Sequence, residues 1–303
     1  MSLGLLFPGQ GAQHAQMLSW LEDTTAAAPA LASLLKQIGP DWRARAADPQ
    51  WLHANSIAQP LLTGVSLAAW QAVAGHLPTP VAIAGYSVGE IAAFSAAGVY
   101  DLDTALDLAA RRAEAMNAAA QGHHGGLLSV QGPSAETLAA ADAELKLAIR
   151  ISTEHVIVGG PTSELHSAAA RWTAAGLRCK QLPIAVASHT PWMTDAAHAF
   201  AGHLATLALK PPTVALISNL TGMPSRQLPV LTSALSGQIA ATVRWDDCLD
   251  SLAERGVRCV LEVGAGSTLT TMWRDRYPDI PARSADEFRS ATGLVDWVLQ
   301  RLA

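Results

Sequence analysis

Residues 81–98 have the sequence VAIAGYSVGEIAAFSAAG, which contains the clearest signal of the fold class. The apolar run at residues 81–84 predicts a buried strand, and the alanine-rich run at residues 90–97 predicts a helix. Between them lies Gly85-Tyr86-Ser87-Val88-Gly89, the GxSxG pattern of a sharp strand-to-helix turn. A buried strand that leads directly into a helix is typical of a parallel sheet covered by helices.

The same alternation continues on both sides of this stretch. Further strands are predicted at residues 3–7, 214–218 and 257–263, and further helices at residues 101–120, 229–241, 246–255 and 285–302. Between residues 123 and 183 the order becomes strand, helix, strand, strand, helix, strand, which is a ferredoxin-like βαββαβ unit. We therefore predict an α/β body made of residues 1–122 and 184–303, with a small subdomain of residues 123–183 inserted into it.

Composition excludes several classes of protein. Of 303 residues, 50% are hydrophobic and 15% are charged, and the net charge is −5, so the chain can bury a core and is not disordered. Nucleic-acid binding favours an excess of basic residues, which this chain lacks. Three distant cysteines without a CxxC pair indicate a reduced protein.

The sequence shows neither a targeting pattern nor a metal-binding pattern. No basic residue precedes Lys36 as a signal peptide requires, and no run reaches the roughly 18 apolar residues of a membrane span. The adjacent His123 and His124 have no third ligand at metal spacing. We therefore expect a cytoplasmic protein with no bound metal and with neither a nucleic-acid nor a membrane partner.

Ser87 is the candidate nucleophile. A GxSxG turn exposes the serine hydroxyl, and the backbone N–H of the next residue, Val88, can point at an oxyanion. The alternative is a tight turn that serves packing alone. A serine needs a base to become nucleophilic, and the chain has ten histidines. We favour His189, because it follows an extended apolar segment and precedes Pro191, but the pattern leaves the other histidines open.

Two further features can bind a ligand. Arg112 lies on the apolar face of the helix predicted at residues 101–120, where a guanidinium is costly unless it meets a carboxylate. That carboxylate can come from the protein, as a buried salt bridge, or from an anionic substrate. Gln10 stands between two glycines, so its loop either lets the backbone approach a ligand closely or is simply a tight turn. Neither this loop nor the segment Gly264-Ala265-Gly266 completes a nucleotide-binding motif.

These features occur together in one known family. The chain resembles the malonyl-CoA:acyl carrier protein transacylases over nearly its whole length. The resemblance rests on an ordered series of motifs: Phe7-Pro8-Gly9-Gln10-Gly11, Gln59-Pro60, the GxSxGE turn through Glu90, Arg112 placed 25 positions after the serine, Ser188-His189, Asn219, Gln238 ahead of Trp245, and Glu262 to Gly266.

The resemblance implies a fold and a set of roles. It implies an α/β hydrolase-like body with a ferredoxin-like insert, no permanently bound cofactor, malonyl-CoA as substrate and an acyl carrier protein as partner. Ser87 would be acylated, with His189 as its base, oriented by the carbonyl or side chain of Gln238. The residues expected to assist are the backbone N–H groups of Val88 and Gln10 as oxyanion hole, Arg112 as the partner of the malonyl carboxylate, and Gln59 as a residue of the pocket.

Two positions depart from the family pattern. Family members usually carry histidine where this chain has Tyr86 and proline where it has Ala265. The GYSVGE turn most resembles the transacylase (epsilon) subunit of bacterial malonate decarboxylase, which loads that enzyme's own carrier protein. The alternatives are the housekeeping transacylase of fatty acid synthesis, a serine esterase or thioesterase, and a non-catalytic scaffold that binds a carrier protein.

Overall fold

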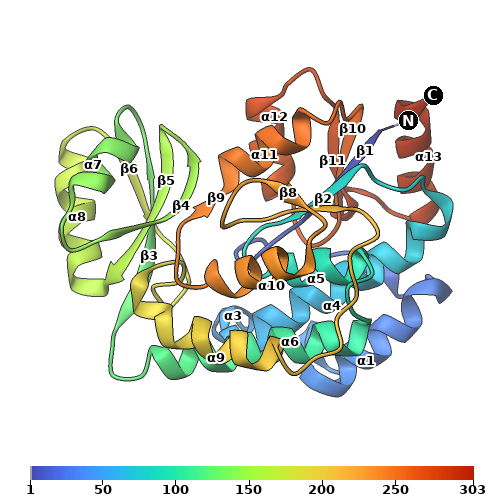
Figure 1. Ribbon diagram of the computed structural model, residues 1–303, viewed down its shortest axis with the longest axis horizontal. Helices are drawn as coiled ribbons and strands as arrows, with labels where there is room; N and C mark the ends of the chain where they lie inside the picture. Colours follow the sequence, from blue (N-terminus) through green and yellow to red (C-terminus); the bar gives the residue numbers. More distant parts are fainter. Residues whose placement is uncertain (1) are drawn as a thin grey trace.

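A large, mostly parallel sheet forms the centre of the protein (Figure 1). The computed structural model describes residues 2–303. The strand order is β11-β10-β1-β2-β7-β8, and every neighbouring pair is parallel except β7 with β8. The strands are β1 (Leu3–Phe7), β2 (Ala82–Gly85), β7 (Ala215–Ile217), β8 (Pro224–Ser225), β10 (Cys259–Glu262) and β11 (Ala282–Ser284).

Helices cover both faces of this sheet. The α-helices of the body are α1 (Ala28–Ile38), α2 (Trp42–Arg45), α3 (Pro49–His53), α4 (Asn55–Val73), α5 (Gly89–Ala96), α6 (Leu102–Ala119), α9 (Thr194–Leu204), α10 (Leu228–Gly237), α11 (Trp245–Ala253), α12 (Thr268–Arg276) and α13 (Ala291–Leu302). Five short 3-10 helices join them, at Ser19–Leu21, Thr25–Ala27, Ala74–His76, Pro191–Met193 and Ala285–Glu287.

Alternation along β1 explains the two hydrophobic cores. Leu3, Leu5 and Phe7 point to one side and pack with α1, α4, α5, α6 and α13, whereas Leu6 points to the other side and packs with α11 and α12. Successive side chains of a strand face opposite sides of its sheet, so a strand that is apolar at every position needs helices on both. The burial of all five residues of β1 follows from this arrangement.

A second, smaller sheet stands beside the body, at the left of Figure 1. It consists of β3 (Gly125–Gln131), β4 (Lys146–Ser152), β5 (His155–Pro161), β6 (Arg178–Gln181) and β9 (Val243–Arg244), in the order β6-β3-β5-β4-β9. Helices α7 (Ala135–Ala141) and α8 (Thr162–Ala174) pack on one face, against Leu128 and Val130. The opposite face, which includes Leu127 and Ile157, packs against Trp245 of the body.

The predicted fold class is confirmed: an α/β body with a mainly parallel sheet, and a βαββαβ unit whose four strands have the ferredoxin-like order. The boundaries given for the small subdomain, 123–183, stay a prediction. The small sheet also includes β9, which comes from the segment assigned to the body and pairs in parallel with β4. The body therefore supplies one edge of the small sheet.

One expectation from the sequence needs correction. The single helix expected at 285–302 is a 3-10 turn followed by α13, because Ser290 adopts an extended backbone and its side chain accepts a hydrogen bond from Gly293 N–H, which starts a new helix. The segment Asn55–His76 is long and apolar enough, by length and composition, to cross a membrane. Because 78% of its apolar window is buried inside the protein, we identify it as a core helix.

Candidate active site

Ser87 occupies the turn between β2 and α5. Its φ is 54°, a left-handed conformation that is uncommon for a residue with a side chain. The two flanking glycines allow the turn to pack this closely. A Cβ atom on Gly85 would lie 2.2 Å from the backbone nitrogen of Glu90, and one on Gly89 would lie 2.2 Å from the carbonyl oxygen of Phe7. Both contacts are impossible for any larger residue, so the backbone requires the two glycines of the GxSxG pattern.

His189 is the histidine that meets Ser87. Its Nε2 lies 2.8 Å from the Ser87 Oγ, and its Nδ1 lies 2.6 Å from the backbone carbonyl oxygen of Gln238. Because a carbonyl can only accept, Nδ1 carries the proton and Nε2 is free to accept one from the serine. Burial, assisted by the charge of Arg112, lowers the pKa of His189 to about 3, so the imidazole is neutral at pH 7.

Gln238 orients the histidine through its backbone. Its carbonyl makes the bond to His189, whereas its side-chain Nε2 donates to the carbonyl oxygen of Ser87 at 3.3 Å. Of the two options that the sequence left open, the backbone carbonyl is the group in contact with the imidazole. A neutral acceptor therefore takes the position that a carboxylate occupies in a Ser-His-Asp triad.

Arg112 is buried beside the serine, with 1% of its surface exposed. Its Nη1 donates to Gln59 Oε1 at 2.8 Å and its Nη2 to Ser87 Oγ at 3.4 Å, while its Nε has no partner in the part of the chain that the structure describes. Among residues 2–303 no carboxylate lies within 4.0 Å of this guanidinium. A direct salt bridge within the protein, one of the two readings of the sequence, is therefore not formed.

The loop that carries Gln10 lies against the nucleophile turn. A Cβ atom on Gly9 would lie 2.6 Å from the carbonyl oxygen of Tyr86, so this contact is also one that only glycine permits. The Gln10 side chain donates to Asn55 Oδ1 at 3.1 Å. Within residues 2–303 the backbone N–H groups of Gln10 and Val88 donate to no protein acceptor. Both are thus available to a ligand.

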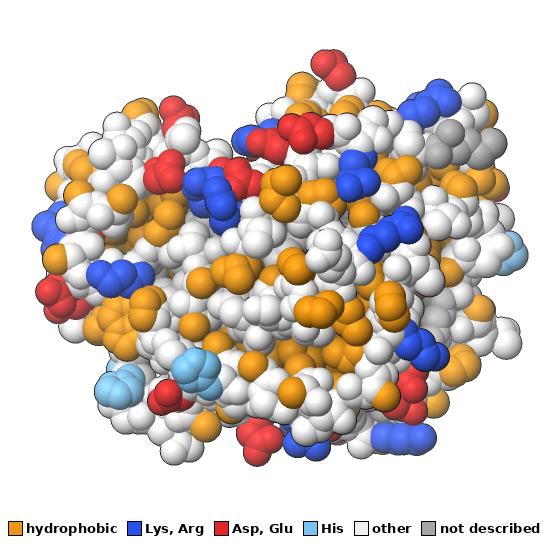
Figure 2. All heavy atoms as spheres, viewed as in Figure 1, with side chains coloured by type: hydrophobic (Ala, Val, Ile, Leu, Met, Phe, Trp, Pro, Cys, Tyr) orange, Lys and Arg blue, Asp and Glu red, His pale blue; other side chains and the backbone are white. Residues whose placement is uncertain are grey.

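A cavity of about 50 Å³ adjoins these groups between the two sheets. A second cavity of about 280 Å³ shares four lining residues with it: Gln10, Tyr86, Ile157 and Leu182. Besides Gln10 and Tyr86, the polar side chains along the larger one are Ser129, Gln131, His155, Lys180 and Thr268. In space-filling view the outline of the protein is notched between the lobe of the small sheet and the body, and charges of both signs are interspersed on the visible face (Figure 2).

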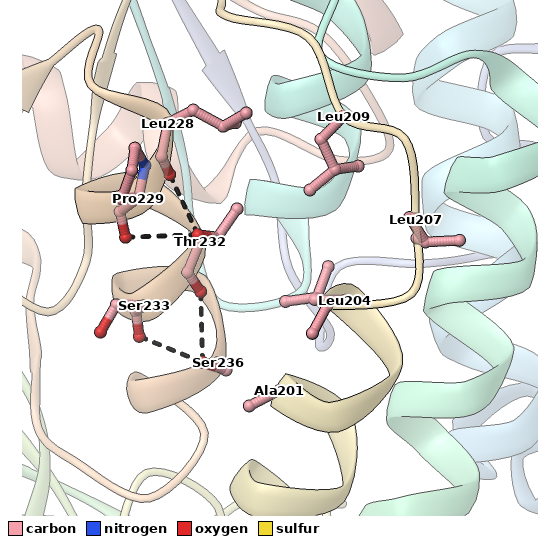
Figure 3. Close-up of a pocket in the computed structure, with 10 residues that line it drawn as sticks. Ala201, Leu204, Leu207, Leu209, Leu228, Pro229, Thr232, Ser233 and Ser236 are labelled. Carbon is pink, nitrogen blue, oxygen red and sulfur yellow. Dashed lines mark hydrogen bonds between the residues drawn. The ribbon is translucent and has the colours of Figure 1, made fainter.

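A larger cavity, of about 540 Å³, lies elsewhere, between α9 and α10 (Figure 3). Its lining is apolar except for three hydroxyl side chains, and two of these are used within their own helix: Thr232 donates to the carbonyl of Leu228 and Ser236 to that of Thr232. No titratable side chain lines it. This cavity has nothing with which to catalyse a reaction.

Among the described residues 2–303, no group of three or more histidine, cysteine or acidic side chains could hold a metal ion. The cysteines Cys179, Cys248 and Cys259 are unpaired.

The structure also reveals two residues of the site whose roles the sequence does not predict. Asn219 and Glu90 are only members of motifs in the sequence, yet both are buried beside the Ser87 turn and bonded to it or to each other. A polar residue inside an otherwise apolar stretch, as Asn219 is after Val214 to Ile217, is the signal that could have identified it.

A serine on a strained strand-to-helix turn, bonded to a neutral histidine beside free backbone N–H groups, is the arrangement of serine-dependent acyl-transfer enzymes. The comparison with protein families gives the particular class. The chain belongs to the family described as the acyl transferase domain, whose model matches residues 5–294.

Similar proteins of known name agree with this family. The malonyl CoA-acyl carrier protein transacylase of Mycobacterium tuberculosis is 32% identical over 294 residues, which cover 93% of this chain and 95% of that protein. The transacylase of the same name from Haemophilus influenzae is 27% identical over 311 residues, or 97% and 98% of the two chains. The solved structure of the Xanthomonas oryzae malonyl-CoA:acyl carrier protein transacylase has a TM-score of 0.89, 27% identity, and coverage of 98% and 99%.

Proposed function

We propose that this protein is a malonyl-CoA:acyl carrier protein S-malonyltransferase. It would move a malonyl group from malonyl-CoA to the phosphopantetheine-type thiol of an acyl carrier protein, through a malonyl ester on Ser87. The observation that carries the proposal is Arg112, a buried guanidinium without a direct carboxylate partner, within 3.4 Å of the Ser87 hydroxyl. The names of the relatives that match the whole chain agree with it.

The first half-reaction forms the acyl-enzyme. The Ser87 oxygen attacks the thioester carbonyl while its proton passes to Nε2 of His189, which the 2.8 Å separation allows. The negative charge on the carbonyl oxygen is met by the free N–H groups of Val88 and Gln10, each worth roughly 3 to 4 kcal/mol in comparable sites. The carbon–sulfur bond then breaks, and the leaving thiolate takes the proton from Nε2.

The second half-reaction is the reverse of the first with a different thiol. The carrier's thiol gives its proton to His189 and attacks the malonyl ester, and Ser87 recovers the proton as its oxygen leaves. Throughout, the Arg112 guanidinium pairs with the free malonyl carboxylate, for which its planar set of N–H donors is suited. Gln59, whose Oε1 accepts from Arg112 Nη1 at 2.8 Å, holds the guanidinium in place.

A hydrolase is the competing reaction, because the same turn occurs in esterases and thioesterases. In the common hydrolase order the histidine comes late in the chain, whereas here no histidine follows His203. Arg112 also gives no advantage with a neutral ester. A non-catalytic scaffold is the remaining alternative, and it gives no reason for the bond between Ser87 and a neutral His189.

The identity of the carrier protein that receives the malonyl group is a separate, narrower proposal. We propose the carrier subunit of a malonate decarboxylase, and the support is the GYSVGE turn with Tyr86 in a chain of nine tryptophans. The housekeeping role in fatty acid synthesis is the alternative, supported by the names of the matched transacylases. Transfer from malonyl-enzyme to each purified carrier separates them: faster loading of the fatty-acid carrier would overturn the narrower proposal.

One experiment tests the reaction itself. The protein is mixed with malonyl-CoA carrying an isotopic label in the malonyl group, and intact-protein mass spectrometry follows the adduct with time. A stable malonyl adduct that a carrier thiol removes supports the transferase. Rapid release of free malonate without a carrier would mean a hydrolase, and no adduct would mean a scaffold.

A further inference from the structure

Asn219 spans the nucleophile turn with its side-chain amide. It lies in the loop after β7 and is fully buried. Its Oδ1 accepts the Ser87 N–H at 2.7 Å, and its Nδ2 donates to the carbonyl oxygen of Gly85 at 2.5 Å. The two bonds hold the peptide groups on either side of Tyr86, so one side chain fixes the backbone that leads into the serine.

This contact matters because the turn is strained. Ser87 has a φ of 54°, and a side-chain-bearing residue keeps such a conformation only when its surroundings impose it. The bond from Ser87 N–H also has a chemical consequence. With that N–H used by Asn219, the next one, of Val88, is the first N–H of the turn left to a developing oxyanion.

The backbone of Asn219 is itself fixed at both ends. Its N–H donates to Glu90 Oε1 at 2.7 Å, and its carbonyl oxygen accepts from Arg244 N–H at 2.9 Å. Glu90 stands in the first turn of α5, three residues after Ser87, and 1% of it is exposed. The bonds thus form a closed ring that runs from the turn to Asn219, then to Glu90, and back along α5 to the turn.

We propose that Asn219 is a positioning residue, which holds the Ser87 turn in its strained conformation and thereby aims the Ser87 hydroxyl and the Val88 N–H at the reacting carbonyl, with Glu90 holding Asn219. This inference rests on the proposed acyl transfer at Ser87. Asn219 does not line the cavity at Ser87, so it acts through the turn and not on the acyl group.

Substitutions of Asn219 and of Arg112 are expected to differ in their effects on kcat and KM. A displaced nucleophile and N–H slow the chemical step for every acyl group, and misplacement by about 1 Å can cost about 100-fold. Asn219→Ala is therefore expected to lower kcat about 30- to 1000-fold for malonyl-CoA and acetyl-CoA alike, with KM within threefold of wild type. A kcat within threefold of wild type would overturn the proposal.

A control and a milder variant keep the test decisive. Ser251→Ala removes another buried side-chain-to-backbone bond, from Ser251 Oγ to the carbonyl of Gly222 at 2.6 Å, and it should lower Tm without changing kcat. If Asn219→Ala does not fold, the isosteric Asn219→Asp replaces it: it keeps an acceptor for Ser87 N–H but loses the donor to Gly85. It should lower kcat about tenfold or more at unchanged KM, and unchanged kcat in this folded variant would refute the proposal.

A second readout is independent of the acyl donor. A small sulfonyl fluoride labels a nucleophilic serine: the serine oxygen bonds to sulfur, fluoride leaves, and the serine proton passes to the histidine. Intact-mass kinetics should show Ser87 labelled more slowly in the folded Asn219 variants than in wild type or Ser251→Ala. If wild type is labelled but not malonylated, the proposed function fails while the positioning role is still tested, and equal labelling rates would overturn that role.

Discussion

Removing the Arg112 side chain is the most discriminating test of the substrate assignment. In the Arg112→Ala variant the cavity beside Ser87 loses its buried guanidinium and gains space next to Met116 and Gln59. A malonyl group brings a carboxylate to that position, and an acetyl group brings only a methyl. The two thioesters therefore differ in the one feature that Arg112 is proposed to recognise.

The size of the effect follows from burial. Arg112 is 1% exposed, so a carboxylate bound to it is poorly hydrated, and breaking a buried charge pair from one side costs about 3–5 kcal/mol. At about 1.36 kcal/mol per factor of ten, this is about two to four decades in kcat/KM for malonyl-CoA. Acetyl transfer makes no such pair and is expected to stay level or rise.

The assay measures kcat/KM with malonyl-CoA and acetyl-CoA, together with a melting curve. Arg111→Ala is the matched control, because Arg111 is next in the chain, half exposed, and paired at 2.7 Å with Asp107 on the surface of α6. It should leave both values near wild type. Equal losses for the two thioesters in Arg112→Ala, accompanied by a lower Tm, would refute the role of Arg112 in binding the acyl group.

Three other variants test the remaining parts of the site. Ser87→Ala should abolish the malonyl adduct in intact-protein mass spectra while leaving the melting curve almost unchanged, and an adduct on this variant would exclude Ser87 as the acylated group. His189→Ala should slow acylation by several orders of magnitude. Because the pKa of His189 is lowered to about 3, wild-type kcat/KM should lack an acid limb near pH 6.5, which a stopped-flow pH series would reveal. Burial raises the pKa of Glu90 to about 8, so the folded protein keeps a proton on Glu90 that the unfolded chain loses above about pH 4.5. The contribution of Glu90 to stability is therefore full below about pH 4.5 and is lost as the pH rises to about 8. The free energy of unfolding in urea should therefore fall from pH 6.5 to pH 8, above the range in which the neutral His189 opposes the trend. Glu90→Gln should reduce the fall, leaving a part due to Glu262, whose pKa is raised to about 7. An equal fall in the variant would mean that Glu90 is ionised at neutral pH.

Local patterns were enough to predict most of the fold. The strand at 3–7 and the βαββαβ order between 123 and 183 were read from runs of apolar residues and their spacing, and the structure has these elements. The strands that were missed, β8, β9 and β11, have two or three residues each. Such short strands form because a neighbouring strand provides the hydrogen-bond partners, as β4 does for β9. The local sequence of the short strand does not reveal which strand that neighbour will be.

The residues of the site also fall into two groups, those that local sequence predicts and those that only the folded chain reveals. Ser87 could be identified because a strained turn needs glycines at fixed positions, and Arg112 because a guanidinium on an apolar helix face is costly. The pairing of Ser87 with His189 spans 102 residues, so only the folded chain can select among ten histidines. Gln238 meets the histidine through its backbone carbonyl, a group that every residue has, and no side-chain pattern can reveal it.

The position of Arg112 also links substrate binding to the state of the base. Burial, with the Arg112 charge as a smaller cause, lowers the pKa of His189, and burial raises the pKa of Glu90. The positive charge in the pocket is therefore only partly balanced by the nearby carboxyl group. An uncompensated cation favours an anionic acyl group and, at the same time, keeps the imidazole neutral and ready to accept the serine proton. When a malonyl carboxylate pairs with Arg112, that positive charge is offset, and the imidazole can hold the proton more easily during attack. The acyl group that the pocket selects would therefore also assist the proton transfer that its reaction requires, whereas an acetyl group would bring no such assistance.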